Sequence, residues 1–176
     1  AGEQTLDIVR RVGPNGSVLA TDLSAGILHL AEDKLRAAGL LGQVQLLQAD
    51  VQALGPDNTG FDAAVCRLGL MFCAEPLLAL KEIHRALRDG ASLGAVVFSQ
   101  PERNPCITIT MRTAQRHVGM TSGDPYARGG LLSLGRPGLM AALMHEAGFS
   151  SVEVRAVSAP FVAPRCEDYV DFVRNA

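Results

Sequence analysis

The sequence lacks cysteine pairs, basic runs and long apolar stretches, and each absence excludes a class of protein. Cys66, Cys73, Cys106 and Cys166 form no Cys-x-x-Cys pair and have no histidine pair nearby, which argues against a zinc site or a disulfide framework. No run of Lys and Arg occurs and the formal net charge is −2, which argues against a nucleic-acid partner. No apolar stretch reaches the roughly 18 residues of a membrane-spanning helix. We therefore expect a cytoplasmic protein with free thiols, no metal and no stable membrane insertion.

The sequence also lacks an initiator Met and any strand pattern ahead of its first glycine. Ala1 and Gly2 resemble the last step of a glycine-rich turn that runs directly into a helix. In nucleotide-binding α/β folds such a turn follows a strand. We therefore expect the chain to be truncated at its amino end.

Apolar segments of two kinds alternate along the rest of the chain. Hydrophobic residues make up 48% of the 176 residues, which suits a parallel sheet covered on both faces. Strand and helix patterns take turns, with Gly and Pro between them, so we expect an α/β protein with a Rossmann-like, doubly wound, mostly parallel sheet in a three-layer αβα arrangement. The expected strands cover residues 17–22, 44–50, 61–67, 92–99 and 152–157. The expected helices lie at 3–12, after Ser24, after Pro76, at 107–118, after Pro137 and at 167–174.

Four strand ends are candidate sites, because the ligand of such a sheet lies at the carboxyl ends of its strands. Gly2 would let the backbone approach a ligand closely, although a plain turn is the simpler explanation. Asp22, twenty residues later, could accept from both hydroxyls of a ribose or could cap a helix. Asp50 could accept from the exocyclic amine of an adenine or could be a loop residue. Residues 66–72 turn apolar and could exclude water from a reactive centre, or could belong to the ordinary core.

Few residues offer proton-transfer chemistry. Of the four histidines, only His117 lies in the irregular segment at 100–135, where a cap over a substrate would be built. The two tyrosines, Tyr126 and Tyr169, belong to no Tyr-x-x-x-Lys pattern. We therefore name no catalytic residue and keep His117 as a candidate acceptor contact.

Taken together, these segments resemble the class I S-adenosylmethionine-dependent methyltransferases, and more narrowly the branch of ubiquinone and menaquinone methylation. The segment AGEQTL resembles the tail of the family's glycine loop. The segments VLATDLSAGILHLA, LLQADVQAL, FDAAVCRLGLMF and ALRDGASLGAVVFS resemble its following motifs, in order. The similarity extends to residue 99 and continues loosely through residues 146–149.

The resemblance implies S-adenosyl-L-methionine as the cofactor and gives roles to particular residues. Gly2 would lie beside the methionine part, Asp22 would hold the ribose, and Asp50 would meet the adenine amine. The other implied cofactor contacts are Leu23 and Val51 beside the adenine and Arg67 near both the cofactor and the acceptor.

The resemblance also divides the chain. Residues 1–99 would form the Rossmann-like cofactor-binding core, residues 100–135 a cap over the acceptor, and residues 136–176 the end of the same domain. The expected acceptor contacts are Met71, Met111, Arg112 and His117.

Two departures from the family pattern are visible. The turn usually written Pro-Gly-Gly is Asp89-Gly90-Ala91, which is tolerable because Gly90 can still take the left-handed conformation. The first strand and the final antiparallel strand have no counterpart, so we expect truncation at both ends.

The function implied is methyl transfer from S-adenosyl-L-methionine to an O, N or C atom of a small-molecule acceptor. A nicotinamide-dependent Rossmann oxidoreductase is one alternative, since it shares the glycine turn and Asp22 but does not call for Asp50. A non-catalytic remnant or interaction domain is another alternative. The sequence leaves a homodimer open.

Overall fold

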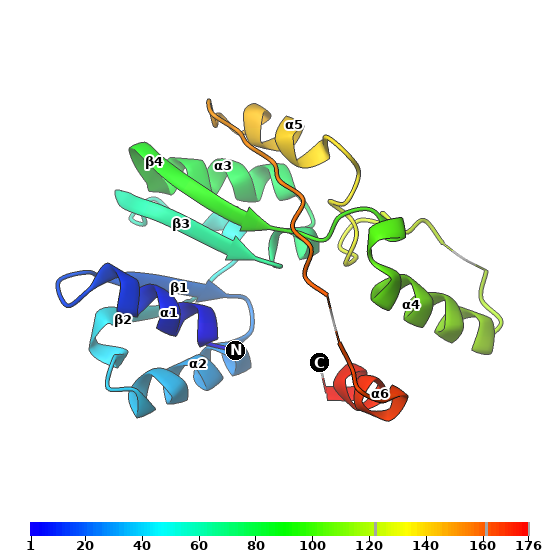
Figure 1. The fold of residues 1–176 in the computed structure, drawn as a ribbon. Helices are drawn as coiled ribbons and strands as arrows, with labels where there is room; N and C mark the ends of the chain where they lie inside the picture. The colour runs from blue at the N-terminus through cyan, green and yellow to red at the C-terminus, as the bar shows by residue number, and fades with distance from the viewer. Residues whose placement is uncertain (122, 161, 176) are drawn as a thin grey trace.

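The computed structural model describes residues 1–121, 123–160 and 162–175. These residues form four strands and six α-helices, with short 3-10 helices between some of them (Figure 1). In chain order they are α1 (Glu3–Val12), β1 (Val18–Asp22), α2 (Ala25–Ala37), η1 (Leu41–Gln43), β2 (Val44–Gln48), η2 (Val51–Ala53), β3 (Phe61–Arg67), η3 (Leu70–Phe72), α3 (Pro76–Ala86), β4 (Leu87–Val96), η4 (Pro101–Arg103), α4 (Pro105–His117), α5 (Leu139–Glu146) and α6 (Cys166–Asn175).

The four strands form two parallel pairs. β1 pairs with β2 in register, from Val18 opposite Val44 to Asp22 opposite Gln48. β3 pairs with β4, with an irregular register near the start of β3. Among the described residues no ladder joins β1 to β3. The strand arrows of both pairs nevertheless point the same way in Figure 1, so their carboxyl ends lie along one edge.

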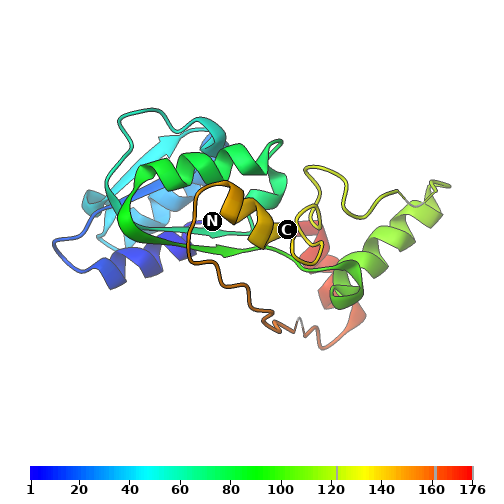
Figure 2. The same cartoon turned by 90° about the horizontal axis from the view of Figure 1, so that it is seen from above.

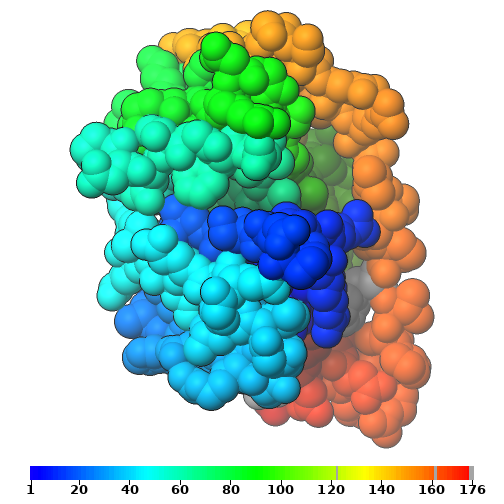
Figure 3. Space-filling view, turned by 90° about the vertical axis from the view of Figure 1, so that its left-hand side faces the viewer, coloured from blue at the N-terminus to red at the C-terminus, as the bar shows by residue number. Residues whose placement is uncertain are grey.

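The two strand pairs are connected through η2, which packs against α3. Just after η2, the Leu54 N–H donates to Oε2 of Glu82 on α3 at 3.1 Å. Arg85, one turn further along α3, donates to the Gly55 carbonyl at 2.6 Å. In the space-filling view the green and teal half, with β3 and β4, rests directly on the blue and cyan half (Figure 3). Helix α3 therefore holds the turn that ends the β1–β2 pair.

One cluster of buried residues lies under α3, where the apolar spacing of its sequence predicts a buried face. Leu80 and Ala79 are fully buried there. They pack with residues from η3, from the segment before α5 and from α5 itself, which lies over α3 (Figure 2). The buried members of this cluster are Leu70, Met71, Ala79, Leu80, Ile83, Leu134, Met140 and Ala147.

Helices α4 and α6 stand apart from this core, beyond the carboxyl ends of the strands (Figure 1). No residue of α4 is buried. The hydroxyl group of Tyr169 on α6 donates to the Cys106 carbonyl at 2.6 Å and lies 2.5 Å from the Thr110 hydroxyl, so it links α6 to α4. Among the described residues, no helix is long and apolar enough to cross a membrane.

The α/β class, the parallel strands and most element positions agree with the sequence prediction. Helix α1 and strand β3 have the predicted bounds, and Ser24 caps α2 by accepting from the Ile27 N–H at 3.3 Å. Strand β4 differs, because it begins directly after α3 at Leu87 and ends at Val96. Gly90 inside it has the left-handed φ of 77° that its turn position predicts.

The strand predicted at residues 152–157 is wrong. This segment is extended but forms no ladder, and Val154 and Val157 are exposed. An alternating pattern can form a strand only where a neighbouring strand supplies hydrogen-bond partners, and none of the described strands is paired with this segment.

Leu80→Ala should lower the free energy of unfolding by about 2–5 kcal/mol, because it leaves a cavity under α3. Leu78→Ala, on the same helix, is the matched control, since Leu78 is 49% exposed whereas Leu80 is 0% exposed. The control should cost less than about 1 kcal/mol. Urea denaturation of both variants checks this, and equal losses would contradict the buried face assigned to α3.

Candidate functional site

Two hollows of similar size open on either side of the molecule. One, of about 290 Å³, lies at the amino ends of β1 and β2 and is lined by no titratable side chain: Ser17, Val18, Leu19, Gly42, Gln43, Val44, Gln45 and Phe61. The other, of about 270 Å³, lies at the carboxyl ends and is lined by Ala1, Gly2, Glu3, Gln4, Thr5, Ala20, Thr21, Asp22, Ile27, Leu28, Ala31 and Arg67. Only the second offers charged groups, so we take it as the candidate site.

This pocket is lined by residues of both strand pairs. Asp22 reaches it from the end of β1, Arg67 from the end of β3, and Gly2 from the start of α1. These are three of the six predicted cofactor contacts, brought together from distant parts of the sequence. Leu23, Asp50 and Val51 do not line the hollow itself but occupy the neighbouring turns at the same edge.

Gly2 permits a close approach of two helices. Its φ of 83° is left-handed, and a Cβ at this position would lie 2.9 Å from the Cα of Ala31 on α2. An ion pair between Glu3 and Lys34 joins the same two helices. The Lys34 ammonium group is the main cause that lowers the pKa of Glu3 to about 2. A glycine is therefore required for α1 to begin against α2, beside the pocket that residues 2–5 line.

One of the two carboxylate oxygens of Asp22 accepts a hydrogen bond. Oδ1 accepts from the Ser24 N–H at 2.8 Å, while Oδ2 accepts from none of the described residues. The next residue, Leu23, is 66% exposed, and its carbonyl accepts from Nε2 of Gln48 at 3.0 Å. The turn after β1 therefore presents a carboxylate oxygen beside an open apolar side chain.

Asp50 belongs to the turn beside Asp22. The Ala49 N–H donates to the Asp22 carbonyl at 3.1 Å, which keeps the two turns adjacent. The Asp50 carboxylate accepts from the Gln52 backbone N–H at 2.8 Å and from the Gln52 side chain, and both residues are half-buried. Val51 begins η2 between them. Gln52 was not predicted, because an amide side chain two residues after an Asp carries no motif signal beyond a local turn.

The exit of β3 is conformationally unusual. Leu68 is the one non-glycine residue with positive φ among those described, at 59°, and its N–H donates to the Val96 carbonyl at 2.8 Å. Such strain is often found beside functional sites. Burial raises the pKa of the Cys66 thiol, and burial together with the nearby Cys66 and Asp50 raises the pKa of Cys73 to about 11. Both thiols therefore stay protonated near neutral pH and are poor nucleophiles.

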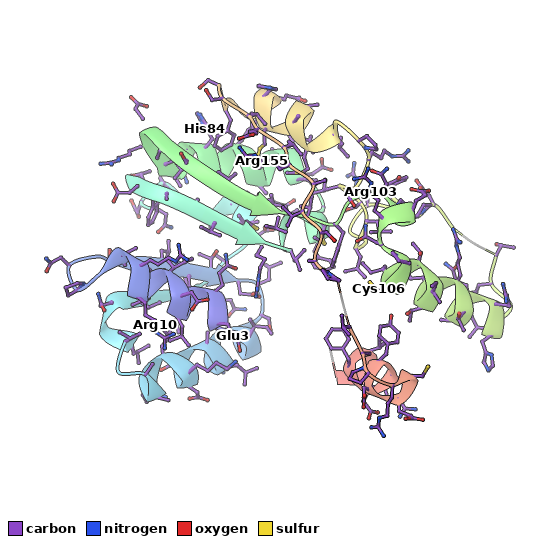
Figure 4. All side chains as sticks on the ribbon, viewed as in Figure 1. Glu3, Arg10, His84, Arg103, Cys106 and Arg155 are labelled. Atoms are coloured by element: carbon purple, nitrogen blue, oxygen red, sulfur yellow. The ribbon has the colours of Figure 1, made fainter. Side chains whose placement is uncertain are left out.

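The predicted acceptor contacts fall into two groups. Met71, in the middle of η3, is 0% exposed and packs in the core, so it offers no open surface to an acceptor in this structure. Met111, Arg112 and His117 are exposed on α4, across from the carboxyl ends of the strands. Figure 4 labels Cys106 at the start of that helix. None of these three residues lines the pocket.

Comparison with known proteins decides the family. The profile of a family described as "Methyltransferase domain" matches residues 1–90, about half of the chain. A ubiquinone/menaquinone biosynthesis C-methyltransferase, UbiE, of Salmonella paratyphi B is 30% identical over 171 residues, covering 92% of this chain and 68% of that protein. The chain belongs to the class I S-adenosylmethionine-dependent methyltransferases. S-adenosyl-L-methionine is therefore its methyl donor, and the match favours this family over the nicotinamide-dependent oxidoreductases.

Solved structures support the fold. The [4+2]-cyclase SpnF aligns with a TM-score of 0.59 at 22% identity, over 84% of this chain and 46% of that one. A Bacillus halodurans C-125 protein, assigned as a methyltransferase, aligns with a TM-score of 0.57 at 23% identity, over 78% of this chain and 55% of that one. This methyltransferase chain thus spans about half the length of each, and both share its Rossmann-like architecture.

Gly2→Ala should destabilise the protein more than Gly138→Ala. Both glycines precede a helix with nearly the same left-handed backbone, φ 83° and 80°, but a Cβ at Gly138 would meet no atom within 4 Å. The backbone strain is therefore matched, and the clash with Ala31 should add about 1–3 kcal/mol. Urea denaturation measures the difference. Equal losses would mean that α1 and α2 can separate freely.

Proposed function

We propose that this chain binds S-adenosyl-L-methionine at the carboxyl edge of its two strand pairs and transfers the methyl group to a small-molecule acceptor. The observation that carries the proposal is the pocket in which Asp22 from β1, Arg67 from β3 and the start of α1 converge. The cofactor contacts proposed are Gly2, Asp22, Leu23, Asp50, Val51 and Arg67.

The two carboxylates, which are hydrogen-bond acceptors, suit the adenosine part of the cofactor. Asp22 has a carboxylate oxygen without a bond from the described residues, which fits a ribose hydroxyl. Asp50, on the adjacent turn, can accept from the adenine amine. Leu23 and Val51 offer apolar surface beside these carboxylates, so an aromatic ring would be covered while its polar edge is recognised.

The start of α1 suits the methionine part. The first intrahelical bond runs from the Leu6 N–H to the Gly2 carbonyl, so the N–H groups of the first turn have no carbonyl acceptor within the helix. Glu3, Gln4 and Thr5 of that turn line the pocket. Such N–H groups, together with the helix dipole, favour a carboxylate.

The transfer depends on positioning. A sulfonium supplies an activated methyl group, and an in-line approach by the acceptor atom needs orientation and exclusion of water. In this proposal Arg67 stands near the cofactor and the acceptor, and α4 brings Met111, Arg112 and His117 to the acceptor side. No residue is assigned as a general base.

The acceptor atom proposed first is carbon, because the Salmonella relative is named a C-methyltransferase; oxygen and nitrogen are the alternatives. Residues 1–99 would bind the cofactor, residues 100–135 would cap the acceptor, and residues 136–176 would complete the domain. The four free thiols suit a reducing compartment, so we propose a cytoplasmic enzyme.

Asp22→Ala should weaken the binding of S-adenosylhomocysteine at least tenfold, about 1.4 kcal/mol, because it removes the acceptor for the ribose hydroxyls. Asp33→Ala on α2 is the control, since that carboxylate is exposed and paired with Arg36 away from the pocket. Isothermal titration calorimetry measures both. Unchanged affinity in a folded Asp22→Ala variant would remove Asp22 from the site.

A second titration separates the proposed function from its rivals. The chain should bind S-adenosylhomocysteine and should not bind NAD, because only the former calls for carboxylates at both Asp22 and Asp50. Tight binding of NAD alone would favour an oxidoreductase, and binding of neither ligand would favour a non-catalytic role. Transfer of a labelled methyl group to quinol-type and amine acceptors then tests the acceptor atom.

A further inference from the structure

The side chain of Gln52 bridges Asp50 to the start of α3. Its Nε2 amide donates to both carboxylate oxygens of Asp50, at 3.0 Å to Oδ1 and 2.9 Å to Oδ2. Its Oε1 accepts from the Glu75 backbone N–H at 2.6 Å. This orientation of the amide is dictated by its partners, because a carboxylate only accepts and a backbone N–H only donates.

These bonds leave Asp50 with little freedom and little spare capacity. A carboxylate offers about four lone-pair positions. Gln52 fills three of them, two on Oδ1 through its backbone and side-chain N–H groups and one on Oδ2. One position on Oδ2 is left for a single further donor, and the carboxylate plane is fixed although its torsion is ordinarily soft.

The rigidity comes from α3. Glu75 directly precedes that helix, whose Ala79 and Leu80 are fully buried. The neighbouring bonds from Leu54 to Glu82 and from Arg85 to Gly55 hold the same turn without using Gln52. Loss of the Gln52 side chain should therefore free the Asp50 carboxylate without releasing the turn.

We propose that Gln52 is a positioning residue for recognition of the cofactor's adenine. It does not touch the ligand; it holds the Asp50 carboxylate so that one lone pair of Oδ2 is presented to the exocyclic amine. This inference rests on the proposed function, in which Asp50 accepts from that amine.

The test uses Gln52→Met, which keeps the side-chain length and removes both hydrogen-bonding groups. Binding of S-adenosylhomocysteine is compared with binding of S-inosylhomocysteine, in which a carbonyl oxygen replaces the amine. A freed carboxylate must be ordered again on binding, so affinity for S-adenosylhomocysteine should fall about three- to tenfold. Affinity for S-inosylhomocysteine should change less than twofold, so the ratio of the two dissociation constants should shrink.

Two further variants make the outcome specific. Gln45→Met is the matched control, because Gln45 is exposed on β2 away from this edge; it should leave both affinities unchanged. Asp50→Ala tests the proposed function itself and should also shrink the ratio. If Asp50→Ala shrinks the ratio and Gln52→Met does not, the positioning role is wrong and the adenine role of Asp50 stands. If Asp50→Ala leaves the ratio unchanged, both are wrong.

Equal weakening of both ligands by Gln52→Met would also overturn the inference, because it would indicate general loosening of the turn. Thermal denaturation of the same sample separates this case. The melting temperature of Gln52→Met should stay within a few degrees of the parent protein, since the bonds from Leu54 and Arg85 remain.

Discussion

The contact between η2 and α3 is the interaction on which the arrangement of the two strand pairs depends. A parallel ladder holds β1 to β2 and another holds β3 to β4, but no ladder among the described residues crosses from β1 to β3. What crosses instead is a set of bonds to α3: from Leu54 to Glu82, from Arg85 to Gly55, and from Glu75 to Gln52. Such bonds are worth roughly 1 kcal/mol each, or somewhat more where Glu82 or Arg85 carries the charge, and the packing of η2 against α3 adds to them.

The shape of the candidate site also depends on the contact between η2 and α3. Asp22 and Arg67 line one pocket but belong to different strand pairs, so their separation is set by how the pairs meet. A change in the packing of α3 would therefore move one wall of the pocket relative to the other. A pocket between two separately paired sets of strands can adjust to its ligand more easily than one within a continuous sheet. Ligand binding would in turn stabilise the contact between the two strand pairs.

Local signals explain what the sequence could predict. Ser24 before an apolar helix, Pro76 at a helix start and the alternation of residues 61–67 each act within a few residues, and α2, α3 and β3 follow them closely. The order of Asp22 and Asp50 after their strands likewise placed both carboxylates at one edge. Features that depend on contacts between distant segments could not be predicted from the sequence. Three features depend on segments that are distant in the sequence. These are the missing partner strand for residues 152–157, the burial of Met71 in the core, and the bond between Gln52 and Glu75.

The choice of an amide at position 52 follows from what it must connect. On one side stands a carboxylate, which only accepts, and on the other a backbone N–H, which only donates. A lysine could donate to the carboxylate and a glutamate could accept from the backbone N–H, but neither residue could do both. A lysine would also place a positive charge against Asp50 and compete with a neutral amine donor for its last lone pair, whereas glutamate would repel the carboxylate. An amide joins the two groups, leaves the charge of Asp50 unopposed and keeps one acceptor position open, which is the arrangement that recognition of an exocyclic amine requires.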